Sequence, residues 1–371
     1  MKKTVKIFQL KFEKSFRKNF SRGAKKIFDE AFLSNHTFVK KLENKFKSYN
    51  KSKYCLAVNS GTAALELIFR SIGVENKKVL IASNTFIATA IAAKTAGGIP
   101  IPVDIDSEFR GFDEKDLLKK IDSNTGAVVI VHIGGLISKS LKKIVKICKY
   151  YKIPLVEDCA QSFSSSLNKK FVGNFGIAGA FSLQTTKVLT AGEGGLVVTN
   201  NKIFYKKLYS NRFYGFDYKN NLNFNSWGNN FKMSELVALL ALCDLDRIKK
   251  RISKRKLIAR QYQKNLKNSD WKTLVPEKKH DTAYYKQIII SPISRKLVEN
   301  ELKRNNISLT GGVYYNPLHR QKLLGIFKDS DYPNASFFAD NHICPPCYPE
   351  LRISDIDYVT NVMKNIIKNY K

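Results

Sequence analysis

Long apolar runs are missing from this 371-residue sequence. A membrane-spanning helix needs roughly 20 consecutive apolar residues, and no run approaches that length. The N-terminus is basic, but the apolar core of a secretory signal does not follow it, because charged residues recur between positions 11 and 18. We therefore expect a cytoplasmic protein without a membrane span.

Acidic residues are scarce, with 31 Asp and Glu against 64 Lys and Arg, so the formal net charge is +33. Such an excess suggests an anionic partner. The basic residues are scattered over segments 2–18, 40–53, 139–152 and 249–256, and AT-rich coding sequence would produce the same bias without any function. We expect a solvated basic surface with no nucleic-acid site, although the charge would still attract a small anionic substrate.

Metal-ligand spacing is also missing among the six cysteines. Cys344 and Cys347 form a lone C-x-x-C pair, and neither a second pair nor a thioredoxin-like context accompanies them. We expect free thiols in a reducing cytoplasm and no metal site. Internal repeats and low-complexity linkers are absent as well.

Short apolar runs alternate with amphipathic stretches from about residue 54. The runs are 54–58, 79–82, 99–103, 127–131, 154–157, 178–183 and 195–199, and several are continuous and β-branched. The helical stretches between them include 63–72, 86–96, 113–121 and 138–151. This alternation predicts an α/β fold with a mostly parallel seven-stranded sheet sandwiched by helices. Ligands bind such sheets at the carboxyl ends of the strands.

The C-terminal third has a different pattern. Residues 233–267 contain no Gly or Pro and predict one or two long helices. A strand at 285–290 and helices at 294–305 and 353–368 follow. We predict a large α/β domain over residues 1–250, which includes an N-terminal helical segment, and a smaller α+β domain over 251–371.

Lys187 follows one apolar run and precedes a Gly-rich turn that leads into the next. A loop lysine considered alone is usually solvated. At a strand end beside apolar walls, however, it can act as an amine nucleophile, and the glycines allow a ligand to approach the backbone closely.

Other candidate residues also follow apolar runs. Asp158 is a poor core residue unless it is paired, so it either binds a ligand or caps the next helix. Gly61 and Thr62 lie at a predicted helix N-terminus, which would bind phosphate or serve as a plain cap. Phe86 would stack on a planar ring or belong to the core.

The order and spacing of these motifs resemble those of the DegT/StrS family of nucleotide-sugar aminotransferases, which have the type I, aspartate-aminotransferase-like fold. The matching segments are 37–43, 59–65, 85–89, 102–106, 131–132, 157–161, 180–195, 228–235, 317–319, 344–351 and 356–359. They cover the chain nearly from end to end.

The resemblance implies pyridoxal 5′-phosphate (PLP, or its aminated form PMP) as the cofactor. It implies that Lys187 carries PLP as a Schiff base and later moves the proton between substrate and cofactor. Asp158 would face the pyridine nitrogen, and Gln161 would lie near the 3-hydroxyl group of the ring.

The remaining cofactor contacts and the substrate residues are implied in the same way. Phosphate is assigned to Gly61, Thr62 and Ser182, and ring stacking to Phe86. Asn230 would reach the cofactor of the neighbouring subunit, which implies a homodimer with shared sites. The substrate residues are expected to be Lys232, His319 and Tyr314.

The implied reaction moves an amino group from L-glutamate to a nucleotide-linked keto-sugar, for amino sugars of surface glycans such as O-antigen. Two alternatives stay open. A sugar dehydratase on this scaffold commonly replaces the lysine by His, so Lys187 argues against it. A basic nucleic-acid-binding or regulatory protein that retains the fold has only the charge in its favour. Lys232, Gln184 and Thr186 depart from the commoner family residues, and substrate selection is expected in loops 213–225 and 311–321.

Overall fold

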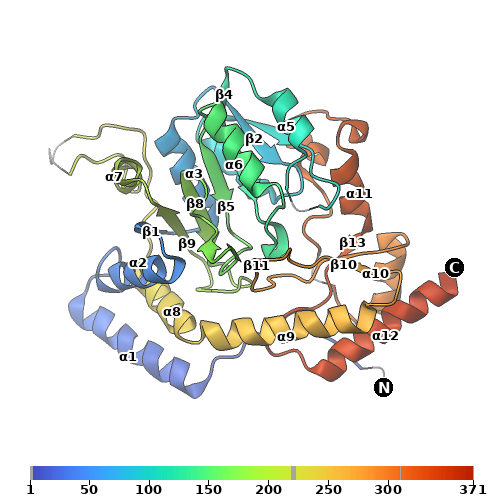
Figure 1. Cartoon of the computed structure of the whole chain (residues 1–371). Coiled ribbons are helices and arrows are strands. Elements are labelled where there is room, and N and C mark those ends of the chain that lie inside the picture. The colour runs from blue at the N-terminus through green and yellow to red at the C-terminus, as the bar shows by residue number, and fades with distance from the viewer. Residues whose placement is uncertain (1–2, 110, 219–222, 310, 371) are drawn as a thin grey trace.

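The central feature of the computed structural model is a seven-stranded sheet (Figure 1). The structure describes residues 3–109, 111–218, 223–309 and 311–370. The strand order is β1-β9-β8-β5-β4-β2-β3. The strands are β1 (Tyr54–Val58), β2 (Lys78–Ala82), β3 (Ile99–Val103), β4 (Thr125–Val131), β5 (Leu155–Asp158), β8 (Ala178–Ser182) and β9 (Gly195–Thr199). Only the pairings of β9 with β1 and β8 are antiparallel, so the predicted mostly parallel α/β sheet is confirmed.

Both faces of the sheet are covered because its strands are apolar on both sides. In β4, Ala127 and Val129 face one buried cluster while Val128 and Ile130 face another. One cluster includes residues of α3 (Gly61–Ile72), α4 (Ile87–Thr95) and α7 (Lys202–Asn211). The other includes residues of α1 (Lys14–Glu30), α2 (Thr37–Asn50), α5 (Glu114–Lys120), α6 (Leu141–Tyr150) and α8 (Glu235–Asp246).

Local signals explain where α3 begins and ends. The Ser60 hydroxyl accepts a hydrogen bond from the backbone N–H of Ala63, at 3.0 Å, which caps the first turn. Gly73 ends the helix at φ +84°, a conformation that favours glycine. The first turn of α3 is thereby fixed just after β1, at the edge of the sheet where a ligand is expected.

The C-terminal part packs on a long helix, α9 (Ile248–Leu266). The other helices here are α10 (Arg295–Arg304), α11 (Pro333–Asn341) and α12 (Ile353–Tyr370). Short strands form two small sheets, β10 (Lys272–Thr273) with β12 (Ile289–Ile290) and β13 (His342–Ile343), and β6 (Ser166–Leu167) with β7 (Lys170–Phe171) and β11 (His280–Asp281). Val5 pairs with Ile307 and joins the buried cluster of this part, and Figure 1 places both termini beside it.

One predicted strand is much shorter than expected. Of the segment 285–290, only Ile289 and Ile290 form a strand. Tyr284 has φ +49°, which breaks the extended path just before the segment. Tyr285, which precedes β12, is not part of a strand and lines a cavity instead.

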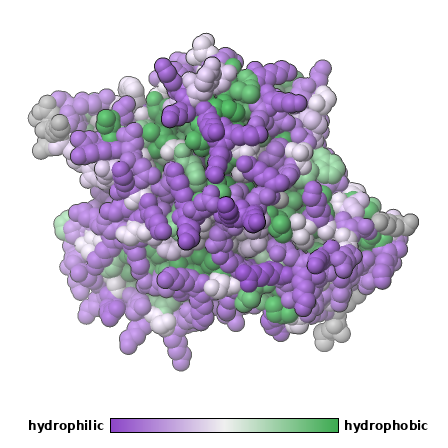
Figure 2. Space-filling model, in the orientation of Figure 1, coloured by the Kyte–Doolittle hydropathy of each residue, from purple (hydrophilic) through white to green (hydrophobic). Residues whose placement is uncertain are grey.

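Hydrophilic side chains cover most of the face seen in Figure 2. Part of this surface is α9, where Lys249, Lys250 and Lys254 are exposed. Within the described residues, no helix combines the length and the apolar character that crossing a bilayer requires.

Candidate active site

A cavity of about 420 Å³ lies at the carboxyl ends of β5 and β8 and beside the first turn of α3. Most of the residues singled out from the sequence line it: Gly61, Thr62, Phe86, Asp158, Gln161, Ser182, Lys187 and Tyr314. These residues come from segments that are far apart in the chain, and the sheet brings them together at one edge.

Asp158 is the last residue of β5 and is buried, with 6% of its surface exposed. One carboxylate oxygen accepts from the N–H of Ala160 at 3.0 Å, and the other accepts from the Thr89 hydroxyl at 2.8 Å. Among the residues that the structure describes, no cation pairs with it, and no helix starts within the next six positions. The helix-cap interpretation is therefore wrong, and the carboxylate is available to a cationic ligand in the cavity.

Gln161 is held by contacts on both ends of its amide group. Its oxygen accepts from the N–H of Gly134 at 2.6 Å, and its nitrogen donates to the Tyr314 hydroxyl at 2.5 Å. Burial raises the pKa of Tyr314 well above its usual range, so this phenol stays neutral. The rings of Tyr314 and Phe86 lie 5.3 Å apart between centroids and form one aromatic wall of the cavity.

Gly61 and Ser182 meet where α3 begins. A Cβ atom added to Gly61 would lie 2.7 Å from the Cβ of Ser182, closer than side chains tolerate. Glycine is thus required for the helix N-terminus to approach the end of β8. With the hydroxyls of Thr62 and Ser182 beside it, this N-terminus can bind a phosphate group.

Lys187 lies in the loop between β8 and β9, and its backbone N–H donates to the carbonyl of Gln184 at 2.8 Å. Its Nζ atom lies 4.7 Å from the ring centroid of Tyr285. The Tyr285 hydroxyl is 3.1 Å from the hydroxyl of Thr186. The lysine is therefore positioned by its own loop and by an aromatic ring from the C-terminal part.

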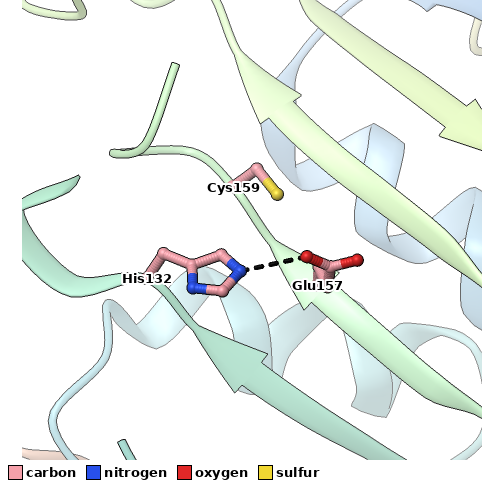
Figure 3. A group of neighbouring side chains, drawn as sticks. All are labelled: His132, Glu157 and Cys159. Atoms are coloured by element: carbon pink, nitrogen blue, oxygen red, sulfur yellow. Dashed lines mark hydrogen bonds and ion pairs between the residues drawn. The ribbon is translucent and has the colours of Figure 1, made fainter. Parts of the chain in front are cut away.

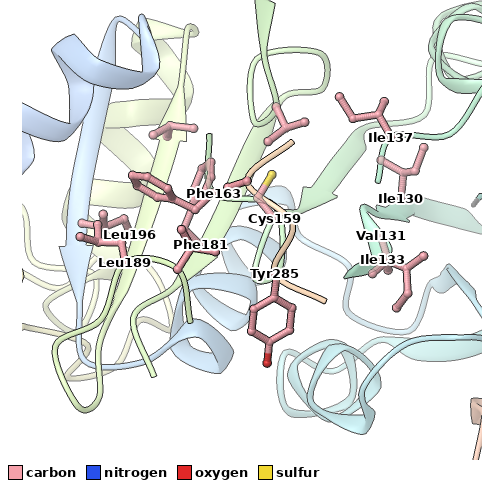
Figure 4. Packing of buried hydrophobic residues seen from close by; sticks show 14 of the residues in the cluster. Ile130, Val131, Ile133, Ile137, Cys159, Phe163, Phe181, Leu189, Leu196 and Tyr285 are labelled. Carbon is pink, nitrogen blue, oxygen red and sulfur yellow. The ribbon is translucent and has the colours of Figure 1, made fainter. Parts of the chain in front are cut away.

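Tyr285 is a site residue that the sequence reasoning missed. Figure 4 shows its ring against the buried cluster, with the hydroxyl pointing away from Cys159. Burial favours a higher pKa for Tyr285, but the charges of Lys187 and Lys286, with hydrogen bonds from Thr186 and Lys187, outweigh it and lower that pKa. An aromatic residue in a predicted strand is typical of a core, so no sequence signal distinguished it.

Three predicted site residues, Asn230, Lys232 and His319, are not among the residues that line this cavity. Asn230 and Lys232 follow a loop beside β1, where the Asn230 carbonyl accepts from Asn59 at 3.2 Å. Burial, followed by the charge of Arg212, lowers the pKa of Lys232, whose Nζ atom lies 3.7 Å from the ring centroid of Phe213. Positions 219–222 of the expected selectivity loop 213–225 fall outside the described residues.

His319 is buried, with 1% of its surface exposed, and its ring nitrogens contact the hydroxyls of Ser83, at 2.7 Å, and Ser336, at 3.0 Å. Its ring stacks on that of Tyr332. Burial lowers the pKa of His319 to about 4, so the imidazole is neutral at pH 7. The Nε2 atom also lies 3.2 Å from a carboxylate oxygen of Asp329, so several contacts fix this ring in place.

A second polar cluster lies behind the cavity and consists of His132, Glu157 and Cys159, whose potential ligand atoms are all within 4.8 Å of one another (Figure 3). The Glu157 carboxylate accepts the N–H groups of three loop residues, Gly173, Phe175 and Gly176, at 2.6–2.9 Å. It also contacts the Nε2 atom of His132 at 3.1 Å. Four partners occupy the acceptor positions of this carboxylate, so the cluster anchors the loop that precedes β8.

The geometry of the cavity fits the expected cofactor. An unpaired carboxylate, Asp158, suits a protonated pyridine nitrogen. The tight contact of Gly61 with Ser182 leaves a helix N-terminus open to phosphate. Lys187 lines the same cavity and supplies an amine for covalent attachment.

Comparisons with known proteins agree with this description. Residues 14–364 match the model of the DegT/DnrJ/EryC1/StrS aminotransferase family. A GDP-perosamine synthase of Escherichia coli O157:H7 is 30% identical over 337 residues, which cover 89% of this chain and 91% of the relative. A UDP-4-amino-4,6-dideoxy-N-acetyl-beta-L-altrosamine transaminase of Campylobacter jejuni (strain 81-176) is 28% identical and covers 93% of this chain and 94% of its own.

Solved structures share the fold over the whole chain. The putative sugar aminotransferase Spr1654 from Streptococcus pneumoniae, in its PLP form, has a TM-score of 0.90 and 21% identity and covers 100% of both chains. The sequence-based prediction of fold and the family resemblance are both confirmed.

Proposed function

Because the chain belongs to the DegT/DnrJ/EryC1/StrS aminotransferase family, we propose that it transfers an amino group from L-glutamate to a nucleotide-linked keto-sugar. The observation that carries this proposal is the presence of Lys187 and the unpaired carboxylate of Asp158 in one cavity at the carboxyl ends of the strands. A nucleotide sugar as substrate is supported by the relatives named as GDP-perosamine synthase and as an altrosamine transaminase.

Each cavity residue has a role in this reaction. Bound PLP would supply an electron sink that stabilises negative charge next to the reacting carbon. Lys187 would hold the cofactor and, once released, move the proton. Asp158 would keep the pyridine nitrogen protonated, and Gln161, fixed by Gly134 and Tyr314, would orient the ring. Tyr285 would position the lysine amine.

The proposal includes a homodimer in which Asn230 reaches the cofactor of the neighbouring subunit. Asn230 is exposed in the single chain and lies outside the cavity lining. Large apolar side chains are exposed nearby, with Trp227 at 89% and Phe224 at 61%, and Phe86 at the cavity is 53% exposed. A second copy would bury such side chains. A cytoplasmic location would suit the six cysteines, none of which is in a disulfide among the described residues.

The dehydratase alternative is not favoured, because dehydratases on this scaffold commonly have His where this chain has Lys187. The basic surface would serve to attract the phosphates of a nucleotide sugar. The sugar product would be destined for a surface polysaccharide, a role consistent with a Bacillus subtilis relative named as a spore coat polysaccharide biosynthesis protein, 27% identical over 364 residues.

A screen of nucleotide-linked 3-keto and 4-keto sugars, with L-glutamate as donor, tests this function. We expect release of 2-oxoglutarate that depends on one of the sugars and is stoichiometric with the aminated product. The purified protein saturated with PLP should also absorb at about 410–430 nm, as expected for PLP attached to a lysine amine. Absence of that band in the saturated wild-type protein would contradict the proposal.

Thr89 should matter for the reaction although it was not predicted from the sequence. Thr89→Val removes the hydroxyl that donates to Asp158 while keeping the shape of the side chain. We expect the rate of the glutamate half-reaction at saturating PLP to fall about tenfold or more, since a hydrogen bond to a charged group contributes about 1.5–3 kcal/mol.

Thr89→Ser retains the hydroxyl and serves as the matched control. Stopped-flow measurement of the half-reaction, with melting temperatures for both variants, separates positioning from folding. Equal rates in Thr89→Val and the wild type would show that this hydrogen bond does not orient Asp158 for the reaction.

A further inference from the structure

A second, smaller cavity of about 170 Å³ lies on the other side of Tyr285. Tyr285 and Thr186 line both cavities, so they form part of the wall between them. The other lining residues of the small cavity are Ile7, Phe8, Arg255, Lys286 and Cys347. A water molecule needs only about 10–15 Å³ of such space, so the small cavity has room for an ion with several heavy atoms.

Arg255 dominates the charge of this cavity. It lies in α9 and is 99% buried, with 1% of its surface exposed. Among the described residues it forms no ion pair. Its Nη1 atom donates to the carbonyls of Tyr284, Tyr285 and Cys347 at 2.7–3.3 Å. Its Nε atom is buried and finds no partner there.

Arg251, in the same helix as Arg255, differs from it because its guanidinium forms an ion pair with a carboxylate. Arg251, one turn earlier, donates to both oxygens of Asp244 at 2.7–2.8 Å. Among the described residues, no carboxylate lies within ion-pair distance of Arg255, and Glu350 acts on it only at longer range, although burying an unpaired charge is costly. Among the described residues that line the small cavity none is acidic, and Lys286 adds a second cationic group to it.

We propose that this small cavity is a binding site for a carboxylate anion, held between Arg255 and Lys286. A guanidinium presents N–H donors in a planar fork that matches the two oxygens of a carboxylate. The lowered pKa of Tyr285 agrees with the positive charges of Lys187 and Lys286, whose Nζ atoms lie 4.7 and 5.4 Å from its ring centroid. A bound carboxylate would complete the hydrogen bonding of Arg255 and offset that charge beside Lys187.

The carboxylate could come from two sources, a free small anion or one end of the amino donor. In the second case the other end would reach the large cavity across the wall formed by Thr186 and Tyr285. That case rests on the proposed function, whereas the anion site itself does not.

Titration calorimetry of the full-length protein without added PLP tests the site. Acetate is titrated at constant ionic strength, with acetamide as the neutral control of the same size. We expect saturable binding of about one acetate per chain and none of acetamide. Lys286→Gln should weaken acetate binding about tenfold or more, because one charged donor is lost. Lys249→Gln, at an exposed position of α9, should leave acetate binding unchanged.

Lys286 is the residue to change because Arg255 also holds three backbone carbonyls and its variants risk unfolding. No saturable acetate binding, or equal binding by the wild type and Lys286→Gln, overturns the proposal. Glutarate identifies the source. If glutarate binds to the wild type at least tenfold more tightly than acetate, but no more tightly than acetate to Lys187→Ala, the amino donor spans both cavities. Equal affinity assigns the site to a free small anion. Since PLP is not needed, a failed transamination assay leaves these results interpretable.

Discussion

Replacing Lys187 by alanine should abolish amino transfer and remove the absorbance band at about 410–430 nm expected for PLP attached to a lysine. Lys187 lines the cavity, and in the proposed reaction it would supply both covalent attachment and proton movement. A positioned acid or base alone contributes about 10²–10⁴-fold in rate, so we expect a loss of at least about 10⁴-fold when attachment is lost as well. Release of 2-oxoglutarate and the absorbance spectrum measure the two functions separately.

Lys119→Ala is the matched control, because Lys119 is an exposed lysine in α5. It should retain the spectrum and the wild-type rate. Amino transfer by Lys187→Ala at more than about a hundredth of the wild-type rate would show that another group moves the proton. A band that persists in Lys187→Ala would place the covalent attachment at a different lysine.

Replacing Glu157 by glutamine should destabilise the protein strongly, although Glu157 does not line the cavity. Its carboxylate accepts from the N–H groups of Gly173, Phe175 and Gly176. It also contacts His132, as Figure 3 shows. Each carboxylate oxygen of Glu157 has two of these partners. In glutamine one of the two oxygens is replaced by an NH₂ group, which would face two donors instead of accepting from them. Two buried donors would then lose their acceptor, at about 1–3 kcal/mol each, so we expect a loss of about 2–6 kcal/mol in the free energy of unfolding.

Urea unfolding followed by circular dichroism measures this change. Glu75→Gln makes the same chemical change at an exposed position beyond α3 and should shift the unfolding free energy by less than about 0.5 kcal/mol. A Glu157→Gln variant as stable as Glu75→Gln would mean that the loop before β8 does not depend on this carboxylate.

The sequence by itself determined the sheet and the chemical centre of the site. Strands buried on both faces carry continuous apolar runs, such as residues 127–131 of β4, so each run was visible without knowledge of its neighbours. Because the ligand edge of a parallel sheet is fixed by strand direction, Asp158 and Lys187 could be assigned to one edge. The sequence placed Gly61 at a helix N-terminus, but the contact with Ser182 that tolerates no Cβ became visible only in the structure.

Only the tertiary structure decided which residues support that centre. Thr89 reaches Asp158 across 69 positions of the chain, and Tyr285 meets Lys187 across a greater separation. The residue types Thr and Tyr do not indicate a contact with a site residue, because both also occur in helices and cores that have no site. His319 resembled a substrate residue by motif, yet its environment buries it against Ser83 and Tyr332. The unpaired charge of Arg255 emerges only from packing, since whether a buried cation has an acidic partner depends on what the fold brings beside it.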